Sequence, residues 1–239
     1  MIERVLKGKY IALPADEPGA AYPWVLACHG SGRCALSYRD VPFYAKQRDI
    51  ALAAGYAFAA CDLELDTYGT PAGLKKLDAF YGWVVANLPV RPRAALWGSS
   101  AGGSGMFRFA GAYPARVHLL LGTFPVWDLL SVTHLASMRA AWGGLEGEAL
   151  EKAVAPYNPA AHLEWTLQVP IAIAHGRNDR AVPLEKNALA RRTRWGSGHI
   201  CSSRTTNTPR RHLACTKRRF SASFWRRGNS GATGEDSLA

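Results

Sequence analysis

The stretch AALWGSSAGGSG, residues 94–105, places two serines between glycines directly after an apolar run. The letters GSSAG match the pattern G-x-S-x-G, and a helix-compatible run follows to about residue 112. A turn between a strand and a helix is the setting of a nucleophile elbow, in which Ser100 would adopt a strained backbone that exposes its hydroxyl. Gly98 and Gly102 supply the small neighbours that such a turn needs. The alternative, an ordinary flexible Gly/Ser loop, does not explain the flanking strand and helix patterns.

The rest of the chain alternates short apolar runs with longer amphipathic ones. The apolar runs are bounded by Gly, Pro or Asp and are typical of strands buried on both faces; they span residues 24–28, 56–61, 94–97, 117–122 and 171–174. The clearest helix pattern covers residues 73–87, where apolar residues recur every three or four positions. This alternation predicts an α/β fold, with a mostly parallel sheet and helices on both of its faces.

The 239 residues are enough for one large domain. We assign residues 1–190 to this domain and read residues 123–168, which break the strand–helix rhythm, as a small lid-like insertion with one or two short helices. Tryptophans such as Trp127 and Trp142 would either line a pocket there or pack as ordinary core residues under a loop. Both interpretations stay open.

The net charge of +11 is concentrated at one end of the chain. Residues 1–190 hold 18 Lys/Arg and 16 Asp/Glu, a balance of +2, whereas residues 191–239 hold 11 Lys/Arg and 2 Asp/Glu, a balance of +9. The main domain is therefore nearly neutral, which argues against nucleic acid as its partner. No apolar run is long enough to span a membrane, and the charged start MIERVLKGKY does not read as a signal peptide, so we expect a cytoplasmic protein.

Three motifs in this order resemble the α/β-hydrolase superfamily, in particular serine esterases and prolyl-oligopeptidase-like catalytic domains. They are HGSG at residues 29–32, the GSSAG turn, and HGRNDRAVP at residues 175–183, each following its own predicted strand. The resemblance implies the α/β-hydrolase fold with Ser100 as the nucleophile and Asp179 as the acid of a catalytic triad. It also implies an oxyanion hole made by the backbone N–H groups of Ser31 and Ala101.

The triad histidine is the weak point of this resemblance. It should follow Asp179 after a helix and a strand, which leaves two candidates, His199 and His212. His199 lies in a Gly-His pair of the kind that family members carry, but only 20 positions separate it from Asp179, and a predicted helix at 184–192 leaves no room for a strand. His212 has a suitable spacing of 33 positions, although its surroundings do not resemble the family's histidine loop. We favour His212 on spacing, with His199 as the alternative.

The basic tail, residues 191–239, differs in composition from everything before it. Arg, Ser, Thr and Cys become frequent after residue 190, and neither a convincing final strand nor an amphipathic final helix is visible, so the sheet would lack its last elements. Three interpretations compete: a solvated disordered tail, an arm that binds nucleic acid through interleaved Arg and aromatic residues, and a shifted reading frame. The composition break coincides with the loss of expected elements, which favours the third.

These features predict a serine hydrolase that cleaves small-molecule carboxylic esters through an acyl-enzyme on Ser100. The alternatives are a catalytically impaired α/β-hydrolase-fold protein without a proper triad histidine, and a peptidase-like member of the superfamily. No P-loop, no suitable G-x-G-x-x-G and no HExxH spacing occurs, so we expect neither a cofactor nor a metal. The sequence does not indicate the substrate or the oligomeric state.

Overall fold

The structure is a computed structural model that describes residues 1–15, 19, 21–166, 169–190 and 199–203; for the last of these segments only the backbone is described. The proposed tail, residues 191–239, therefore lies largely outside the described residues, and so does His212.

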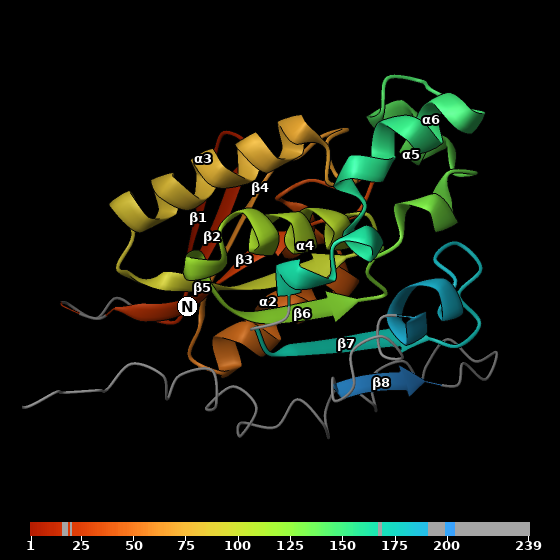
Figure 1. The fold of residues 1–239 in the computed structure, drawn as a ribbon. Coiled ribbons are helices and arrows are strands. Elements are labelled where there is room, and N and C mark those ends of the chain that lie inside the picture. Colours follow the sequence, from red (N-terminus) through yellow and green to blue (C-terminus); the bar gives the residue numbers. More distant parts are fainter. Residues whose placement is uncertain (16–18, 20, 167–168, 191–198, 204–239) are drawn as a thin grey trace, which may run out of the picture.

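The described chain is built on one eight-stranded sheet with the order β1-β2-β4-β3-β5-β6-β7-β8 (Figure 1). The first two strands pair antiparallel, β2 also runs antiparallel to β4, and all later neighbours are parallel. The strands are β1 Ile2–Leu6, β2 Lys9–Leu13, β3 Tyr22–Cys28, β4 Ala57–Cys61, β5 Val90–Ser99, β6 Val117–Thr123, β7 Ile171–Gly176 and β8 His199–Ser203. The predicted mostly parallel sheet is confirmed.

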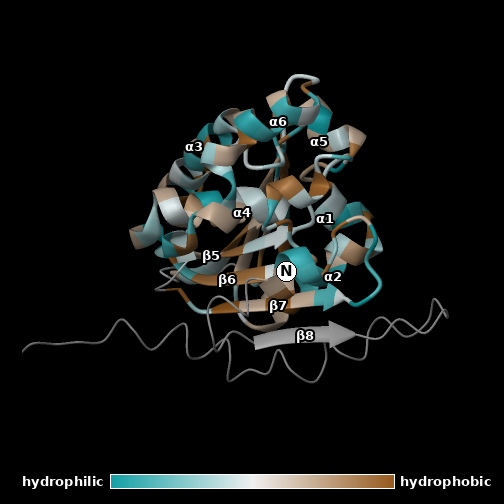
Figure 2. Cartoon of the chain, turned by 45° about the vertical axis from the view of Figure 1, so that its right-hand side comes forward, coloured by the Kyte–Doolittle hydropathy of each residue, from teal (hydrophilic) through white to brown (hydrophobic). Residues whose placement is uncertain are grey.

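Helices cover both faces of this sheet, as the alternating pattern predicts. One buried apolar cluster joins the sheet to α3 and α4, and a second joins its other face to α1 and α2. The helices are α1 Ser37–Asp40, α2 Pro42–Ala53, α3 Pro71–Asn87, α4 Gly102–Ala112, α5 Ala136–Ala141 and α6 Gly147–Val154. In Figure 2 strands β6 and β7 are largely hydrophobic, whereas the helices alternate hydrophilic and hydrophobic residues. This is the pattern of a sheet enclosed between two helical layers.

Helix α3 shows how local sequence sets an element. Thr70 precedes it, and its hydroxyl accepts a hydrogen bond from the Gly73 N–H at 3.0 Å, which satisfies one of the free donors at the helix start. Pro71 occupies the first helical position, where a missing N–H costs nothing. The apolar stripe then buries residues such as Leu77 and Val84 against the sheet.

The insertion between β6 and β7 folds as short helices and turns above the carboxyl ends of the strands (Figure 1). It contains α5, α6 and the one-turn helices η2 Leu129–Val132, η3 Ala155–Tyr157, η4 Pro159–Ala161 and η5 Leu163–Thr166. A third buried cluster lies beneath it and includes Ala101 and Val182 together with apolar residues of the insertion. Trp127 is buried in the cluster that joins the sheet to α3 and α4, and it also lines the cavity described below.

Two parts of the sheet differ from the sequence prediction. The antiparallel strands β1 and β2 were not predicted, and β8 forms at His199–Ser203 although we expected no convincing strand in the tail. Strand β8 pairs with β7 and starts at His199 itself, so it needs no room between Asp179 and His199. Within the helix predicted at 184–192, the structure has a π-helical turn, η6, at Glu185–Leu189; residues 191 and 192 lie outside the described residues.

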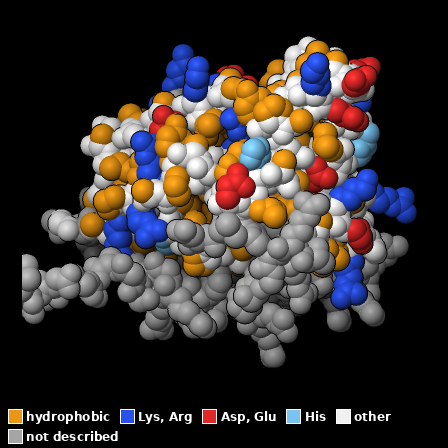
Figure 3. All heavy atoms as spheres, in the orientation of Figure 1, with side chains coloured by type: hydrophobic (Ala, Val, Ile, Leu, Met, Phe, Trp, Pro, Cys, Tyr) orange, Lys and Arg blue, Asp and Glu red, His pale blue; other side chains and the backbone are white. Residues whose placement is uncertain are grey.

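The surface of the main domain carries charges of both signs. On the face drawn in Figure 3, Lys and Arg side chains are interspersed with Asp and Glu. Among the described residues, no helix is long and apolar enough to cross a membrane.

Candidate active site

Ser100 lies in the turn between β5 and α4, at the carboxyl edge of the sheet. Its φ of +52° is in the left-handed region, which is unusual for a residue other than glycine. The Ser100 N–H donates to the Thr123 carbonyl at 3.1 Å, and the Ser100 carbonyl accepts from the N–H groups of Gly103 and Val126, both at 2.9 Å. The backbone of this half-buried serine is therefore held from both its own helix and the neighbouring strand.

The glycines around Ser100 are required by close backbone packing. A Cβ at Gly98 would lie 2.8 Å from the Gly103 Cα, and a Cβ at Gly103 would overlap Pro125. A Cβ at Gly102 would overlap the carbonyl groups of residues 28 and 29. The small residues predicted for a nucleophile elbow thus have a direct structural reason.

The turn that follows β3 packs directly against this elbow. A Cβ at Gly30 would lie 3.3 Å from the Ser100 Cβ and 2.9 Å from the Tyr44 hydroxyl. The Gly30 N–H donates to that hydroxyl at 3.1 Å. Ser31, next in the chain, is half-buried, and within the described part of the chain neither its N–H nor that of Ala101 has a hydrogen-bond acceptor. Among the described residues, one backbone donor without an acceptor thus lies in the elbow directly after Ser100, and the other lies in the turn after β3 that packs against it.

His29 has a structural role in this turn. Its Nε2 accepts a hydrogen bond from the Leu63 N–H at 3.0 Å, so the ring proton is on Nδ1, which donates to the Gly30 carbonyl at 2.9 Å. Burial lowers the pKa of His29, which keeps the ring neutral. Both ring nitrogens are used in hydrogen bonds.

Asp179 lies in the loop that leaves β7. Its Oδ1 accepts hydrogen bonds from the N–H groups of Ala181 and Val182, at 3.0 and 2.9 Å. Its side chain is 21% exposed, so a hydrogen-bond partner can reach the second oxygen, Oδ2. Val182 belongs to the same buried cluster as Ala101, which links this loop to the elbow.

His175 does not pair with Asp179 as a charged group. Its Nε2 lies 2.8 Å from the Val182 carbonyl and 3.8 Å from Asp179 Oδ2. A carbonyl only accepts, so Nε2 carries the proton, and burial lowers the pKa of the ring. His175 Nδ1 is buried and has no partner among the described residues. The neutral ring therefore holds the loop around Asp179 through the Val182 carbonyl.

The sheet brings the three motif loops to one edge. Register pairs Cys28 with Gly98, Ser99 with Thr123, and Thr123 with Ala174, so the loops after β3, β5 and β7 leave the sheet at the same level. This is the edge at which ligands bind in open α/β sheets.

The structure does not bring His199 to that edge. His199 pairs with Ala172, whereas Ser203 pairs with Gly176, the last residue of β7. Four residues of strand, about 13 Å, therefore separate His199 from the end of β7, where the loop that carries Asp179 begins. His212, the other candidate base, lies outside the described residues.

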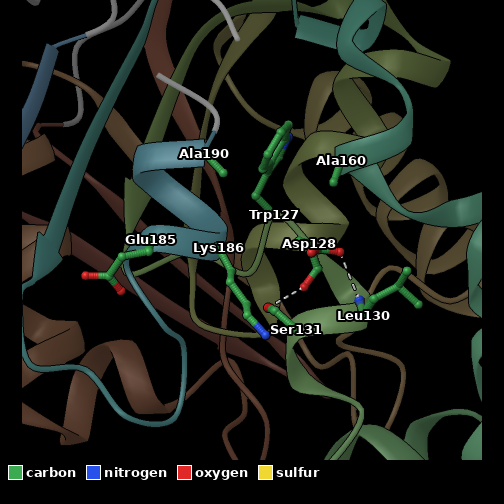
Figure 4. Close-up of a pocket in the computed structure, with 8 residues that line it drawn as sticks. All are labelled: Trp127, Asp128, Leu130, Ser131, Ala160, Glu185, Lys186 and Ala190. Atoms are coloured by element: carbon green, nitrogen blue, oxygen red, sulfur yellow. Dashed lines mark hydrogen bonds between the residues drawn. The ribbon is translucent and has the colours of Figure 1, made fainter. Parts of the chain in front are cut away.

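The structure also holds a cavity of about 390 Å³ between η2, η4 and η6 (Figure 4). None of the predicted site residues lines it; its lining residues are Trp127, Asp128, Leu130, Ser131, Ala160, Glu185, Lys186 and Ala190. Ala190 adjoins residues that the structure does not describe. Among the described residues, no cluster of His, Cys, Asp or Glu is arranged to hold a metal ion.

Sequence reasoning missed the residues that support the elbow from α2. Tyr44 holds the Gly30 turn, and burial raises the pKa of its hydroxyl, which stays protonated. Gln47 exchanges hydrogen bonds with the buried Ser99 hydroxyl at 2.9 and 3.2 Å. Neither residue belongs to a motif, so only the packing of α2 on the sheet reveals them.

Comparison with solved structures finds a similar fold in several serine hydrolases. No family model and no curated protein sequence matches the chain. The fold is similar to FphF, a fluorophosphonate-binding serine hydrolase of Staphylococcus aureus (TM-score 0.62, 16% identity, 83% of this chain and 85% of that one). It is also similar to the esterase domain of a Rhodothermus marinus protein (TM-score 0.53, 21% identity, 81% and 80%). Oligopeptidase B from Leishmania major matches over 84% of this chain but only 31% of its own (TM-score 0.62, 15% identity). The chain thus has the fold of the α/β-hydrolase superfamily, as the three motifs implied.

Proposed function

We propose that the protein is a serine hydrolase that cleaves carboxylic esters through an acyl-enzyme on Ser100. The observation that carries the proposal is the left-handed backbone of Ser100, held between β6 and α4 and placed beside two unpaired backbone N–H groups. A strained residue at the carboxyl edge of an α/β sheet is a strong indication of a functional site.

Each proposed group has a chemical task. A serine hydroxyl attacks a carbonyl only when a base removes its proton, and the base needs a carboxylate to orient it and stabilise its charged form. We assign these roles to Ser100, His212 and Asp179. The N–H groups of Ser31 and Ala101 would stabilise the oxyanion of the tetrahedral intermediate, each by a factor on the order of a hundred or more in rate. Water, activated by the same base, then releases the acid.

The hydrogen bonding of the Asp179 carboxylate supports its assignment. Oδ1 is fixed by two backbone N–H groups, which hold the carboxylate in place and leave Oδ2 for a histidine N–H. His175 cannot fill this position well, because its only N–H is directed to the Val182 carbonyl. The register of β8 favours His212 over His199, as did the spacing in the sequence.

Hydrolysis of p-nitrophenyl esters of increasing chain length tests the proposal. Ser100→Ala should lower kcat/KM by at least three orders of magnitude. Ser31→Ala is the matched control, because it removes a nearby serine hydroxyl and keeps the backbone N–H on which the proposal depends; it should retain most of the activity. Equal rates for the Ser100→Ala variant and the unmodified protein would refute the role of Ser100. Loss of activity in Ser31→Ala with normal folding would show that the Ser31 hydroxyl itself is required, contrary to a role limited to its backbone N–H.

A further inference from the structure

Two phenyl rings face each other on elements that pack against the Ser100 turn. Phe43 on α2 and Phe124, directly after β6, have ring centroids 5.4 Å apart at an interplanar angle of 32°. Phe43 is 41% exposed, and Phe124 is half-buried. We call these two residues the aromatic pair. A large apolar side chain that stays exposed while its neighbour Tyr44 is buried leaves ring surface free to contact a ligand.

Phe124 is fixed next to the proposed nucleophile by the backbone. The Ser100 N–H donates to the carbonyl of Thr123, and the Ser100 carbonyl accepts from the N–H of Val126, so Phe124 lies within the short loop that brackets Ser100. The Phe124 N–H donates to the Ala174 carbonyl at 2.7 Å, which ties the same loop to β7.

Phe43 is connected to the Ser100 turn through its neighbour on α2, Tyr44. Tyr44 accepts the Gly30 N–H, and a Cβ at Gly30 would be 2.9 Å from the Tyr44 hydroxyl and 3.3 Å from the Ser100 Cβ. The Tyr44 hydroxyl and the Ser100 Cβ are therefore separated by no more than these two distances together. The rings of Phe43 and Tyr44 meet edge to face with centroids 5.0 Å apart. Ser100 is therefore linked to the aromatic pair in two ways. One set of contacts passes through Gly30 and Tyr44 to Phe43, and the other is the loop after β6, which carries Phe124.

The backbone of Phe124 is strained. Its φ of +39° lies in the left-handed region, where a bulky side chain is unfavourable and glycine would be free of strain. The sequence therefore places a phenylalanine where the backbone alone would prefer glycine, and its ring packs on an exposed partner instead of entering the core. Strain of this kind at a site is a reason to look for a functional role.

We infer that the aromatic pair forms a subsite that binds an aromatic ring attached next to the scissile ester bond. The inference rests on the proposed function, because it requires Ser100 to be the nucleophile. A substrate ring would pack on Phe43 and Phe124 in tilted or edge-to-face geometry, which adds to the binding gained from burying its apolar surface. The class of substrate is then an aryl-substituted ester rather than a plain alkyl ester.

Four esters of matched size test the inference on the full chain, with acid release followed by pH-stat titration. Methyl phenylacetate is compared with methyl octanoate for the acyl side, and 2-phenylethyl acetate with octyl acetate for the alcohol side. In at least one pair the aryl ester should be preferred by about three- to tenfold in kcat/KM. The pair that shows the preference identifies which side of the ester the rings contact.

The variants Phe43→Leu and Phe124→Leu should each bring that preference close to one. Leu145→Ala, which removes an exposed apolar side chain on the insertion, is the matched control and should keep the preference. The subsite is refuted if the unmodified protein prefers neither aryl ester, or if both Phe variants keep the preference. The proposed function fails in a different way, namely when none of the four esters is hydrolysed or when Ser100→Ala hydrolyses them equally well.

Discussion

Gly102 packs against the carbonyl group of Cys28 so closely that no side chain fits between them. This contact joins the first turn of α4 to the end of β3, and it brings the elbow and the HG turn together. The geometry of the candidate site is therefore built from backbone-to-backbone packing, with glycine at the points of closest approach.

Substitution of this glycine should destabilise the fold. In Gly102→Ala the new Cβ would lie less than 3.0 Å from backbone atoms of residues 28 and 29, which cannot rotate away. We expect a loss of about 3 kcal/mol in the free energy of unfolding, measured by urea denaturation. Gly82→Ala is the control: position 82 is exposed in α3 with open space around it, so the variant should gain about 0.5–1 kcal/mol. Equal stability of the two variants would contradict the close contact.

Substitution of Asn187 should also destabilise the fold. Its fully buried side chain accepts hydrogen bonds from the N–H groups of Trp127 and Asp128, and donates to the Ser131 hydroxyl and the Pro183 carbonyl. Asn187→Ala would remove the side-chain acceptor shared by the Trp127 and Asp128 N–H groups and release the start of the insertion from η6, at a cost of about 2–4 kcal/mol in thermal unfolding.

The exposed Asn87 provides the comparison for this variant. Its side chain makes a single hydrogen bond, to the Trp83 carbonyl. Asn87→Ala should change stability by about 0.5 kcal/mol or less. An Asn187→Ala protein as stable as Asn87→Ala would show that the hydrogen bonds between Asn187 and the insertion do not form.

Stability should fall as the pH drops below neutrality. Burial and the nearby Arg93 lower the pKa of His118 to about 4, and burial also lowers the pKa values of His29 and His175. In the unfolded chain a histidine titrates near pH 6.5, so between about pH 6.5 and 4 the unfolded state binds more protons than the folded state. Protonation then favours unfolding, by up to about 1.4 kcal/mol per pH unit for each histidine.

Removal of the His118 imidazole tests this pH dependence. His118→Gln should flatten the decline in melting temperature between pH 6.5 and 4.5, whereas His134→Gln, at an exposed position, should leave the wild-type slope unchanged. An unaltered slope in His118→Gln would mean that this ring is not held neutral in the folded protein.

The identity of the base can be tested directly. If His212 takes the Ser100 proton, His212→Gln should lower kcat for ester hydrolysis by at least three orders of magnitude. His199 pairs with Ala172, far from the carboxyl end of β7, so His199→Gln should lower kcat by less than tenfold. The opposite ranking would assign the base to His199. If neither substitution affects hydrolysis, the triad assignment is wrong.

Much of the fold follows from patterns that the sequence displays directly. The five predicted strands and helix α3 are recognisable because buried parallel strands are continuously apolar and α3 has a regular apolar stripe. Strands β1 and β2 escaped prediction because β1 is short, mostly exposed and charged, so only its pairing with β2 defines it. Strand β8 escaped because HICSS has no strong apolar pattern of its own and is identified by its register with β7.

The candidate site, too, was predictable from the sequence only in part. The residues at Ser100, Ser31 and Asp179 were indicated by motifs in which glycines permit tight turns. Tyr44 and Phe124 were not, because their importance comes from contacts between α2, the HG turn and the loop after β6, which are far apart in the chain. The base could not be derived from spacing alone, since two histidines follow Asp179.

The most direct test of the central claim is covalent labelling of Ser100 with a fluorophosphonate, followed by mass spectrometry of the digested protein. The account predicts one phosphonyl adduct, located on Ser100 and absent from a folded Ser100→Ala variant. Failure of the correctly folded, full-length protein to react, or an adduct on another residue that persists in Ser100→Ala, would contradict it.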